Sequence, residues 1–402
     1  MCRQEYKTTG SAPVKTPQVV LLPDTPGSMI RKELAHAFNS RGRHVHILQG
    51  DAASPQHIAR MLALPPGRSG LPAHPGLFCS VNFQGMDKHG ELFAVLKNNG
   101  IPAAVWCVDN PWNLLSGLRS PFWKETFLFV SDHSFIADLN AAGAQQVRHM
   151  PLAADPDIFH APKATWKQAA LRPFVFVGRS AFPDKKRFFT GQGVPESLLR
   201  RGQDMLEAGE RPDFSWWWDK LGLLRENTPM WPGSAVRRAG LGAETCSLAW
   251  RMACLSAALP HGLTLIGDEG WRHNFASAHP APDLRPPADY YAHVPAIYAQ
   301  AEFSLNMTSL LLPAGLTQRH FDVWAAGGFC LTDATPGLRI FPPELTAPVT
   351  FASPKHLPET ALNFMRHPRE KARIAKLWQE HILREHCYGH RADSLLVSIF
   401  TH

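Results

Sequence analysis

The strongest constraint on the fold of this chain is the regular alternation of short apolar runs with helix-like segments in its first 150 residues. Five such runs lie at 18–22, 44–48, 77–81, 103–108 and 127–130. The first is followed by a loop and then by Ile30, Leu34 and Phe38, whose spacing of four is helical. Alternating strands and helices are typical of a parallel sheet that helices cover on both faces. Ligands bind such sheets at the carboxyl ends of the strands.

A second series of the same kind predicts a second domain. Its apolar runs lie at 174–177, 263–266 and 303–306. Loop-like and polar residues at 151–171 separate the two series, and about 181–260 is rich in Arg and Trp with a mostly helical pattern. We therefore expect an α/β protein with two Rossmann-like, doubly wound parallel-sheet domains facing a cleft. The expected limits are 1–165 and 166–385, with 181–260 as a helical insertion in the second domain.

Composition narrows the class of protein. The 402 residues favour two or three domains, and 45% apolar with 19% charged residues is a globular composition. The net charge of +7 is mild for this length, so we expect no nucleic-acid partner. The same charge suits an anionic small molecule or peripheral contact with an acidic membrane surface.

The cysteines and the N-terminal residues predict a cytoplasmic protein. Seven cysteines are scattered, no two of them separated by only two residues, and Cys79, Cys107 and Cys330 lie in strand-like runs. We interpret them as buried thiols of a reducing compartment. Residues 1–15 are polar and lack the apolar core of a signal peptide, and no run of about 18 apolar residues occurs.

The segment 317–333 is the most informative stretch for function. Its polar start leads into a short amphipathic run, then Gly327 and Gly328, then an apolar run that ends in Thr-Asp. This order predicts a helix that stops at the glycines and a buried strand after them. Arg319 and Asp322 are three residues apart and share one helix face, where the first suits phosphate and the second suits ribose hydroxyls. The alternative is a solvated helix face.

Further candidates for a nucleotide site lie at strand ends. They are Gly178, Arg179, Asn306 and Thr308. Glycine permits close approach of the backbone to phosphate, arginine neutralises it, and the amide and hydroxyl could donate to phosphate or sugar. For Gly178 and Arg179 the alternative is an ordinary strand end with a surface arginine.

An anion site and a catalytic base are predicted by the same strand-end argument. Gly27 and Ser28 open a helix after the first strand, and helix N-termini favour anions, although a capped turn is an equal interpretation. Asp109, His133 and Asp24 each follow a strand and could deprotonate a hydroxyl group. A buried structural carboxylate or a satisfied histidine is the alternative for each of them.

The predicted insertion carries Trp216, Trp217 and Trp218 in a row. Consecutive residues of a helix point in different directions, so packing of the insertion is the preferred interpretation and stacking on an acceptor sugar the alternative. Basic residues at 185–201 and 237–251 could contact an anionic acceptor or a membrane surface, but such residues more often form a solvated face.

Several stretches resemble, in order, motifs of one enzyme family. Residues 151–159 resemble its "PNGVDxxxF" linker, 174–179 its first donor-domain strand, 263–269 its "LxIxGDG" strand, 293–306 its "dLpxiYaxadfxLN" element and 319–333 its "RxFEaxAcGgfxLTD" segment. With Val-Trp-Cys-Val-Asp-Asn-Pro at 105–111, the chain from about 18 to 385 resembles the CgeB-like (spore-maturation-type) glycosyltransferases.

This resemblance implies a GT-B-like fold. The C-terminal domain would bind a nucleotide diphospho-sugar as donor substrate, with no cofactor, and the N-terminal domain would bind the acceptor. Residues 386–402 would cross back to the N-terminal domain. The family usually has glutamate where Asp322 stands, and many relatives have a second acid where Ala314 stands. The phosphate role of Arg319 is therefore better supported than the ribose role of Asp322.

The resulting prediction is a glycosyltransferase that moves a sugar from a nucleotide diphospho-sugar to a hydroxyl of an unidentified glycan, protein or lipid-linked acceptor. Arg179, Arg319 and backbone amides would stabilise the leaving group without a metal ion. An Asp-x-Asp triplet does occur at 155–157, but it lies in the linker-like stretch and Pro156 suits a turn. Two alternatives stay open: a nucleotide-sugar epimerase of the same fold, and a catalytically silent binding or scaffold protein.

Overall fold

The computed structural model describes residues 16–24, 29–160, 170–223 and 230–401. Gly27 and Ser28, the predicted anion site, lie outside these residues. The chain forms two compact units. The first contains the described residues up to Ser80 together with 84–104 and those from Gly389 onward, and the second contains 81–83 and 105–388. The domain limits expected from the sequence stay a prediction.

The first sheet has six strands in the order β2-β1-β3-β4-β5-β6. They are β1 (Val19–Asp24), β2 (His44–Gln49), β3 (Pro75–Val81), β4 (Ala103–Cys107), β5 (Phe127–Val130) and β6 (Gln146–His149). β1 pairs in parallel with β2 and β3, and β5 with β6. Five of the strands were predicted. β6 was not, because it is an edge strand whose polar residues remain partly exposed and leave no apolar run.

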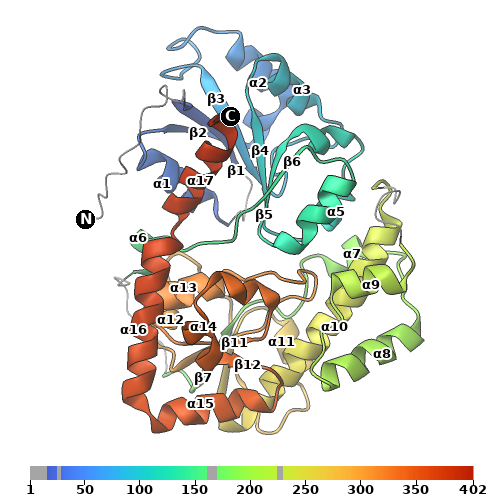
Figure 1. The fold of residues 1–402 in the computed structure, drawn as a ribbon, viewed down its shortest axis with the longest axis vertical. Helices are drawn as coiled ribbons and strands as arrows, with labels where there is room; N and C mark the ends of the chain where they lie inside the picture. The colour runs from blue at the N-terminus through green and yellow to red at the C-terminus, as the bar shows by residue number, and fades with distance from the viewer. Residues whose placement is uncertain (1–15, 25–28, 161–169, 224–229, 402) are drawn as a thin grey trace. The chain divides into compact units, whose positions relative to one another are not determined.

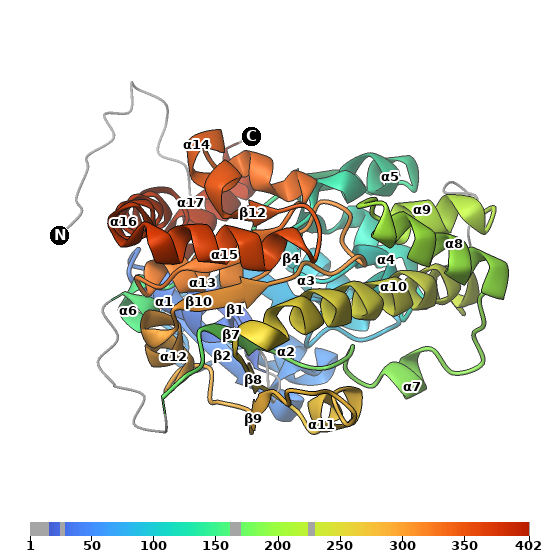
Figure 2. The same ribbon diagram turned by 90° about the horizontal axis from the view of Figure 1, so that it is seen from below.

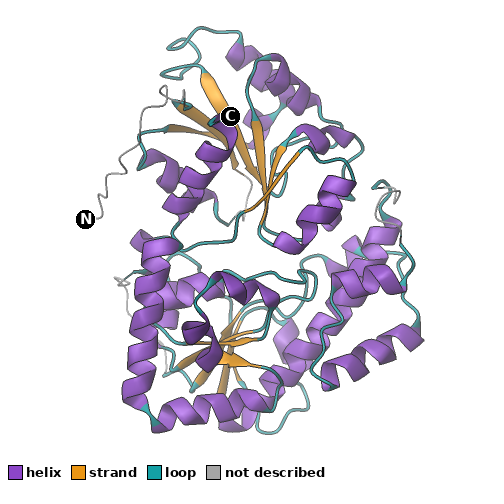
Figure 3. Cartoon of the chain, viewed as in Figure 1, coloured by secondary structure: helices purple, strands orange, loops and turns teal. Residues whose placement is uncertain are grey.

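The second sheet has six strands in the order β12-β11-β10-β7-β8-β9, and every pair is parallel. They are β7 (Phe174–Val177), β8 (Leu263–Ile266), β9 (Asp283–Arg285), β10 (Phe303–Asn306), β11 (Cys330–Asp333) and β12 (Thr350–Phe351). The edge strands β9 and β12 have three and two residues, which is too short for a sequence signal. The predicted α/β architecture of two parallel sheets is confirmed (Figure 3).

Helices of the first unit pack on its part of the sheet (Figure 1). They are α1 (Arg31–Asn39), α2 (Pro55–Leu62), α3 (Glu91–Asn98) and, from Gly389 onward, α17 (Tyr388–Phe400). Val19, Leu21 and Phe78 of the strands form one core with Ile58 of α2 and Leu92 of α3. The guanidinium of Arg41, just after α1, pairs with the Asp393 carboxylate of α17 at 2.7 Å between Nη2 and Oδ2, so the end of the chain is held in this unit.

The second unit holds the remaining helices. They are α4 (Pro111–Leu115), α5 (Ile136–Ala141), α6 (Pro156–Phe159), α7 (Lys185–Phe188), α8 (Glu196–Glu207), α9 (Phe214–Lys220), α10 (Ser234–Ala258), α11 (Gly270–Asn274), α12 (Val294–Gln300), α13 (Arg319–Ala325), α14 (Pro343–Thr346), α15 (His356–Arg366) and α16 (Pro368–Glu385). Among the described helices, none combines the length and the apolarity needed to span a membrane.

The helical insertion is present as predicted. α7 to α10 lie between β7 and β8, and the 25-residue α10 contacts both α8 and α9 (Figure 2). Trp217 and Trp218 are buried, and the Trp217 ring lies so close to Gly242 of α10 that a Cβ there would be 2.2 Å from it. The aromatic run therefore packs the insertion together, as the preferred interpretation had it.

The predicted helix and strand of the segment 317–333 are α13 and β11. α13 stops where expected, since Gly327 has a φ of +77° that an L side chain rarely adopts. Trp324 of α13 stacks on Trp378 of α16 with ring centroids 4.9 Å apart and planes at 3°. This buried aromatic pair fixes α13 against α16, and with it the helix start that carries Arg319. Cys330 at the start of β11 is buried, as predicted.

Candidate functional site

A pocket of about 430 Å³ lies in the second unit at the carboxyl end of β7. Its volume is in the range of small-molecule sites. Four of the predicted residues line it: Asp109, Gly178, Arg179 and Arg319. The structure therefore brings one candidate base together with three candidate donor-binding residues from three separate parts of the sequence.

Two nitrogens of the Arg319 guanidinium bond to the protein, and the third is left to bind a ligand. Its Nε donates to Asn306 Oδ1 at 2.8 Å and its Nη1 donates to the Val177 carbonyl at 2.8 Å, while the group lies 4.8 Å above the Phe176 ring. Within the described part of the chain, Nη2 has no hydrogen-bond partner. A Cβ on Gly178 would lie 3.2 Å from Nη1, so the absence of a side chain there gives the guanidinium its place.

Behind Arg319 lies a buried polar network around His320. The backbone N–H of Thr317 donates to His320 Nδ1 at 3.0 Å, and His320 Nε2 lies at hydrogen-bond distance, 2.9 Å, from Thr332 Oγ1. Burial, and next to it the charge of Arg319, lowers the pKa of His320 to about 3. Asn306 Nδ2 donates to the same Thr332 oxygen. Asn306 thus positions Arg319 from a fully buried place, and a contact of its own with phosphate or sugar stays a prediction.

Two further charged groups of α10 line the pocket. Arg251 Nη1 donates to the carbonyl of Arg179 at 3.2 Å, and its buried Nε has no partner among the described residues. Burial lowers the pKa of Arg251, which the charge of Glu244 opposes. Three arginines therefore line one pocket, and Arg179 is exposed. Each carries a positive charge, because arginine stays protonated in proteins.

Hydrogen bonds from Asn82, which comes directly after β3, fix the position of the Asp109 carboxylate. Asn82 Nδ2 donates to Asp109 Oδ2 at 2.7 Å, and Asn82 Oδ1 accepts the backbone N–H of Val108 at 2.9 Å. Enclosure by protein raises the pKa of the Asp109 carboxyl, and the Asn82 bond opposes this rise. Solvent also reaches the side chain through the pocket, so the rise is smaller than enclosure alone would give. A fixed carboxylate of raised pKa suits proton abstraction.

The other two candidate bases lie elsewhere. His133 is not among the residues lining the pocket. Burial and the charge of Arg339 lower its pKa, and its ring lies 5.4 Å from that of His149. Asp24 ends β1 in the first unit and pairs with Arg31 at 2.7 Å. Their catalytic roles stay predictions.

Asp322 is buried, and both of its oxygens have protein partners. Oδ2 accepts the Tyr290 hydroxyl at 2.6 Å and Oδ1 accepts Gln318 Nε2 at 2.8 Å. A carboxylate oxygen can accept a second bond, so the predicted contact with ribose stays open. No sequence signal pointed to Tyr290, which lies 32 residues from Asp322, whereas Gln318 lies four residues before Asp322, at a spacing where helix side chains meet.

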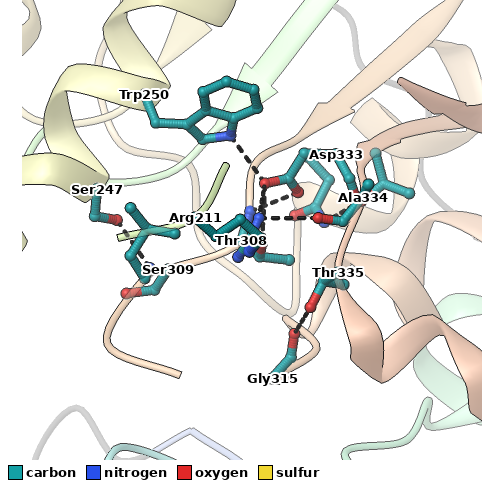
Figure 4. A network of polar contacts seen from close by, with 12 residues as sticks. Arg211, Ser247, Trp250, Thr308, Ser309, Gly315, Asp333, Ala334 and Thr335 are labelled. Atoms are coloured by element: carbon teal, nitrogen blue, oxygen red, sulfur yellow. Dashed lines mark hydrogen bonds and ion pairs between the residues drawn. The ribbon is translucent and has the colours of Figure 1, made fainter. Parts of the chain in front are cut away.

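Thr308 belongs to a second buried network, which Figure 4 shows. Asp333 at the end of β11 accepts Arg211 Nη1 at 3.1 Å, Trp250 Nε1 at 2.9 Å and the backbone N–H of Thr308 at 2.9 Å. The Thr308 hydroxyl accepts Arg211 Nη2 at 2.8 Å and donates to Asp333 Oδ2. The network ties the insertion to the sheet and fixes the start of the loop whose Ser309 lines the pocket. A contact of Thr308 with a ligand stays a prediction.

Comparisons with known proteins agree with the fold. Residues 250–397 match the family model described as glycosyl transferase-like. HepE from Anabaena, solved in complex with UDP and glucose, is 10% identical with a TM-score of 0.53, over 95% of this chain and 100% of that one. A glycosyltransferase from Rickettsia africae is 8% identical with a TM-score of 0.54, over 96% of this chain and 99% of that one. No curated protein matches the sequence. The fold is therefore that of the GT-B glycosyltransferases.

Proposed function

We propose that this protein is a CgeB-like glycosyltransferase that moves a sugar from a nucleotide diphospho-sugar to an acceptor hydroxyl. The observation that carries the proposal is the composition of one pocket. Three arginines, Arg179, Arg251 and Arg319, line the same 430 Å³ pocket as Asp109. Such a set is suited to holding a diphosphate beside a base. The UDP and glucose bound to HepE are in keeping with this reading.

In the proposed reaction, the bond between the anomeric carbon and the diphosphate oxygen breaks while the acceptor oxygen bonds to that carbon. Asp109 takes the proton of the acceptor hydroxyl. Arg319 Nη2 and the exposed Arg179 donate to the departing diphosphate and offset its growing charge, so that no metal ion is needed. Asn306 and Val177 keep Arg319 in place, and Asn82 keeps Asp109 in place.

The test is a donor-binding screen by thermal shift and calorimetry with UDP-, GDP-, ADP- and dTDP-sugars. One donor should bind, and Arg319→Ala should weaken its binding by about 10- to 100-fold, since a charge-assisted hydrogen bond contributes ~1.5–3 kcal/mol. Arg369→Ala, which removes an exposed arginine of α16, is the matched control and should bind as the wild type does. The absence of binding by every donor would refute the proposal.

The nature of the product separates this proposal from its alternatives. A glycosyltransferase without its acceptor should slowly hydrolyse the bound donor to free sugar and nucleotide diphosphate, and Arg319→Ala should lose that activity. An epimerase would instead yield an isomeric sugar, and a silent binding protein would bind the donor and leave it intact. Chromatography of the incubated donor distinguishes the three outcomes.

A further inference from the structure

Besides its charged residues, the pocket is lined by apolar side chains that the protein leaves partly uncovered. They are Leu114 of α4, Phe182, Pro183, Phe188 of α7 and Leu312. Pro183 is exposed and the other four are half-buried. Single exposed apolar residues are common, but several that gather around one pocket are typical of a ligand-binding surface. We call these five residues the apolar wall.

The leucines of the apolar wall lie close to the candidate base Asp109. Asn110 follows Asp109 directly, and the backbone N–H of Leu114 donates to the Asn110 carbonyl at 3.3 Å. The Asn110 side chain reaches the second leucine, because its Nδ2 donates at 2.7 Å to the carbonyl of Leu311, the residue before Leu312. Hydrogen bonds of a single residue therefore hold both leucines beside Asp109.

The aromatic part of the apolar wall is packed against the same helix. The rings of Phe182 and Phe188 have centroids 5.3 Å apart, and Phe189 lies 5.5 Å and 4.9 Å from them. A Cβ on Gly240 of α10 would lie 3.2 Å from the Phe189 ring and 3.0 Å from Asn113 Oδ1 of α4. The rings and α4 thus meet at one glycine, and the aromatic and leucine residues form one surface of the pocket.

The polar side chains beside the apolar wall offer few partners to a ligand. Asn110 bonds to the Leu311 carbonyl and to the Asn113 N–H. Ser309 Oγ accepts the Leu311 N–H at 3.3 Å, and the buried Glu244 accepts a backbone N–H at 2.9 Å. The nitrogen and oxygen of the Asn113 side chain are buried. A saccharide placed here would give up water around its hydroxyls for few new hydrogen bonds, whereas a hydrocarbon group gains free energy by leaving water.

We propose that the acceptor is an alcohol or a phenol with an apolar body, which lies against the apolar wall while its hydroxyl meets Asp109. This inference rests on the proposed function and names the class of its acceptor. Aliphatic and aromatic acceptors share the chemistry that the wall recognises, a hydroxyl on a hydrocarbon group. The hydroxyl oxygen bonds to the anomeric carbon as the bond from that carbon to the diphosphate breaks, and its proton passes to Asp109. The products are an apolar glycoside and a nucleotide diphosphate.

The first measurement is binding without any donor, by saturation-transfer difference NMR titration. The probes are 4-propylphenol, 1-octanol and, as the polar comparison, methyl glucoside. The wild type should bind 4-propylphenol or 1-octanol more tightly than methyl glucoside. Leu114→Ala and Phe188→Ala should each weaken that binding by about tenfold, because each removes apolar contact area. Leu377→Ala shortens a leucine of α16 that is 37% exposed and outside the pocket lining, so this matched control should bind as the wild type does. Melting temperatures identify the variants that fold.

The second measurement is sugar transfer from the donor that the binding screen identifies to each of the three probes, with products detected by mass spectrometry. The apolar probe that binds should be glycosylated, and the phenol and the alcohol arms show which kind of hydroxyl is used. Leu114→Ala should raise the KM for that probe about tenfold and leave the affinity for the nucleotide diphosphate unchanged.

The outcomes separate this inference from the proposed function. Glycosylation of methyl glucoside alone upholds the transferase and overturns the apolar acceptor. Neither apolar probe binding the wild type overturns the inference, and so does equal binding by the wild type and the folded wall variants. An apolar probe that binds the wild type and is lost in the wall variants upholds the ligand class, even if every donor fails to bind and the transferase proposal is refuted.

Discussion

Lowering the pH from about 7.5 to about 5 should destabilise the second unit by about 2 kcal/mol through His320 alone. The folded protein holds this side chain neutral, because it is fully buried and lies next to Arg319, and its pKa falls from 6.5 to about 3. Its Nδ1 accepts the Thr317 N–H at 3.0 Å, so a second ring proton would displace that bond. The unfolded chain has no such constraint.

The sign and size follow from the two pKa values. Above pH 6.5 neither the folded nor the unfolded state binds a second proton on His320, so its titration does not change the free energy of unfolding. Below 6.5 the unfolded chain takes up a proton that the folded protein refuses, so the free energy of unfolding falls by ~1.4 kcal/mol per pH unit until about pH 3. The 1.5 units between pH 6.5 and 5 give about 2 kcal/mol.

The assay is urea unfolding followed by tryptophan fluorescence at both pH values, with linear extrapolation to water. His320→Gln keeps a donor and an acceptor but does not titrate, so it should lose about 2 kcal/mol less than the wild type. Burial also lowers the pKa of His133 and of His46, and comparison with the wild type cancels their share. His356→Gln, at an exposed position, should behave as the wild type does. The same pH dependence in His320→Gln and the wild type would refute the reasoning.

Three further predictions concern the pocket and its support. Asp109→Asn should lower the rate of sugar transfer by about 10²- to 10⁴-fold with donor affinity kept. Wild-type activity should fall on acidification at a pH above the usual carboxyl range, because the pKa of Asp109 is raised. A pH–rate profile checks both, and full activity of the variant would exclude Asp109 as the base. Gly178→Ala should weaken donor binding measured by calorimetry, because its Cβ would lie 3.2 Å from Arg319 Nη1; unchanged affinity would show that Arg319 can move without loss. Arg211→Met should cost about 3–5 kcal/mol in urea unfolding, because it leaves the fully buried Asp333 carboxylate unpaired, and a loss below about 1 kcal/mol would contradict this account.

Much of the fold could be predicted because central strands of parallel sheets are buried on both faces. Their residues form apolar runs that a reader of the sequence can find, as at β5, β8 and β10. The strands that escaped prediction are edges. β6 keeps polar residues in contact with solvent and β12 has two residues, so neither carries a periodic signal.

The candidate site was predictable in part for the same reason. Asp109, Gly178 and Arg319 each sit at the end of a strand or the start of a helix, where function is expected. Asn82 follows β3 as Asp109 follows β4, and the strand-end rule could have found it. The strand-end rule could not find Arg251, because it lies within α10; it was predicted only as one of the basic residues at 237–251 that could contact an anionic acceptor or a membrane surface.

Local sequence by itself determined where this chain forms its central strands, where α13 stops at Gly327, and which side chains are chemically able to hold phosphate. Those properties depend on neighbours within a few residues. Only the tertiary structure decided which of these side chains meet and which are already engaged. Among the described residues, Asn306 and Thr308 are drawn into buried networks, whereas the amide of Asn113 has no hydrogen-bond partner. Hydrogen bonding and burial join residues up to hundreds of positions apart, so a chain's free groups become visible only when the surroundings of each are known.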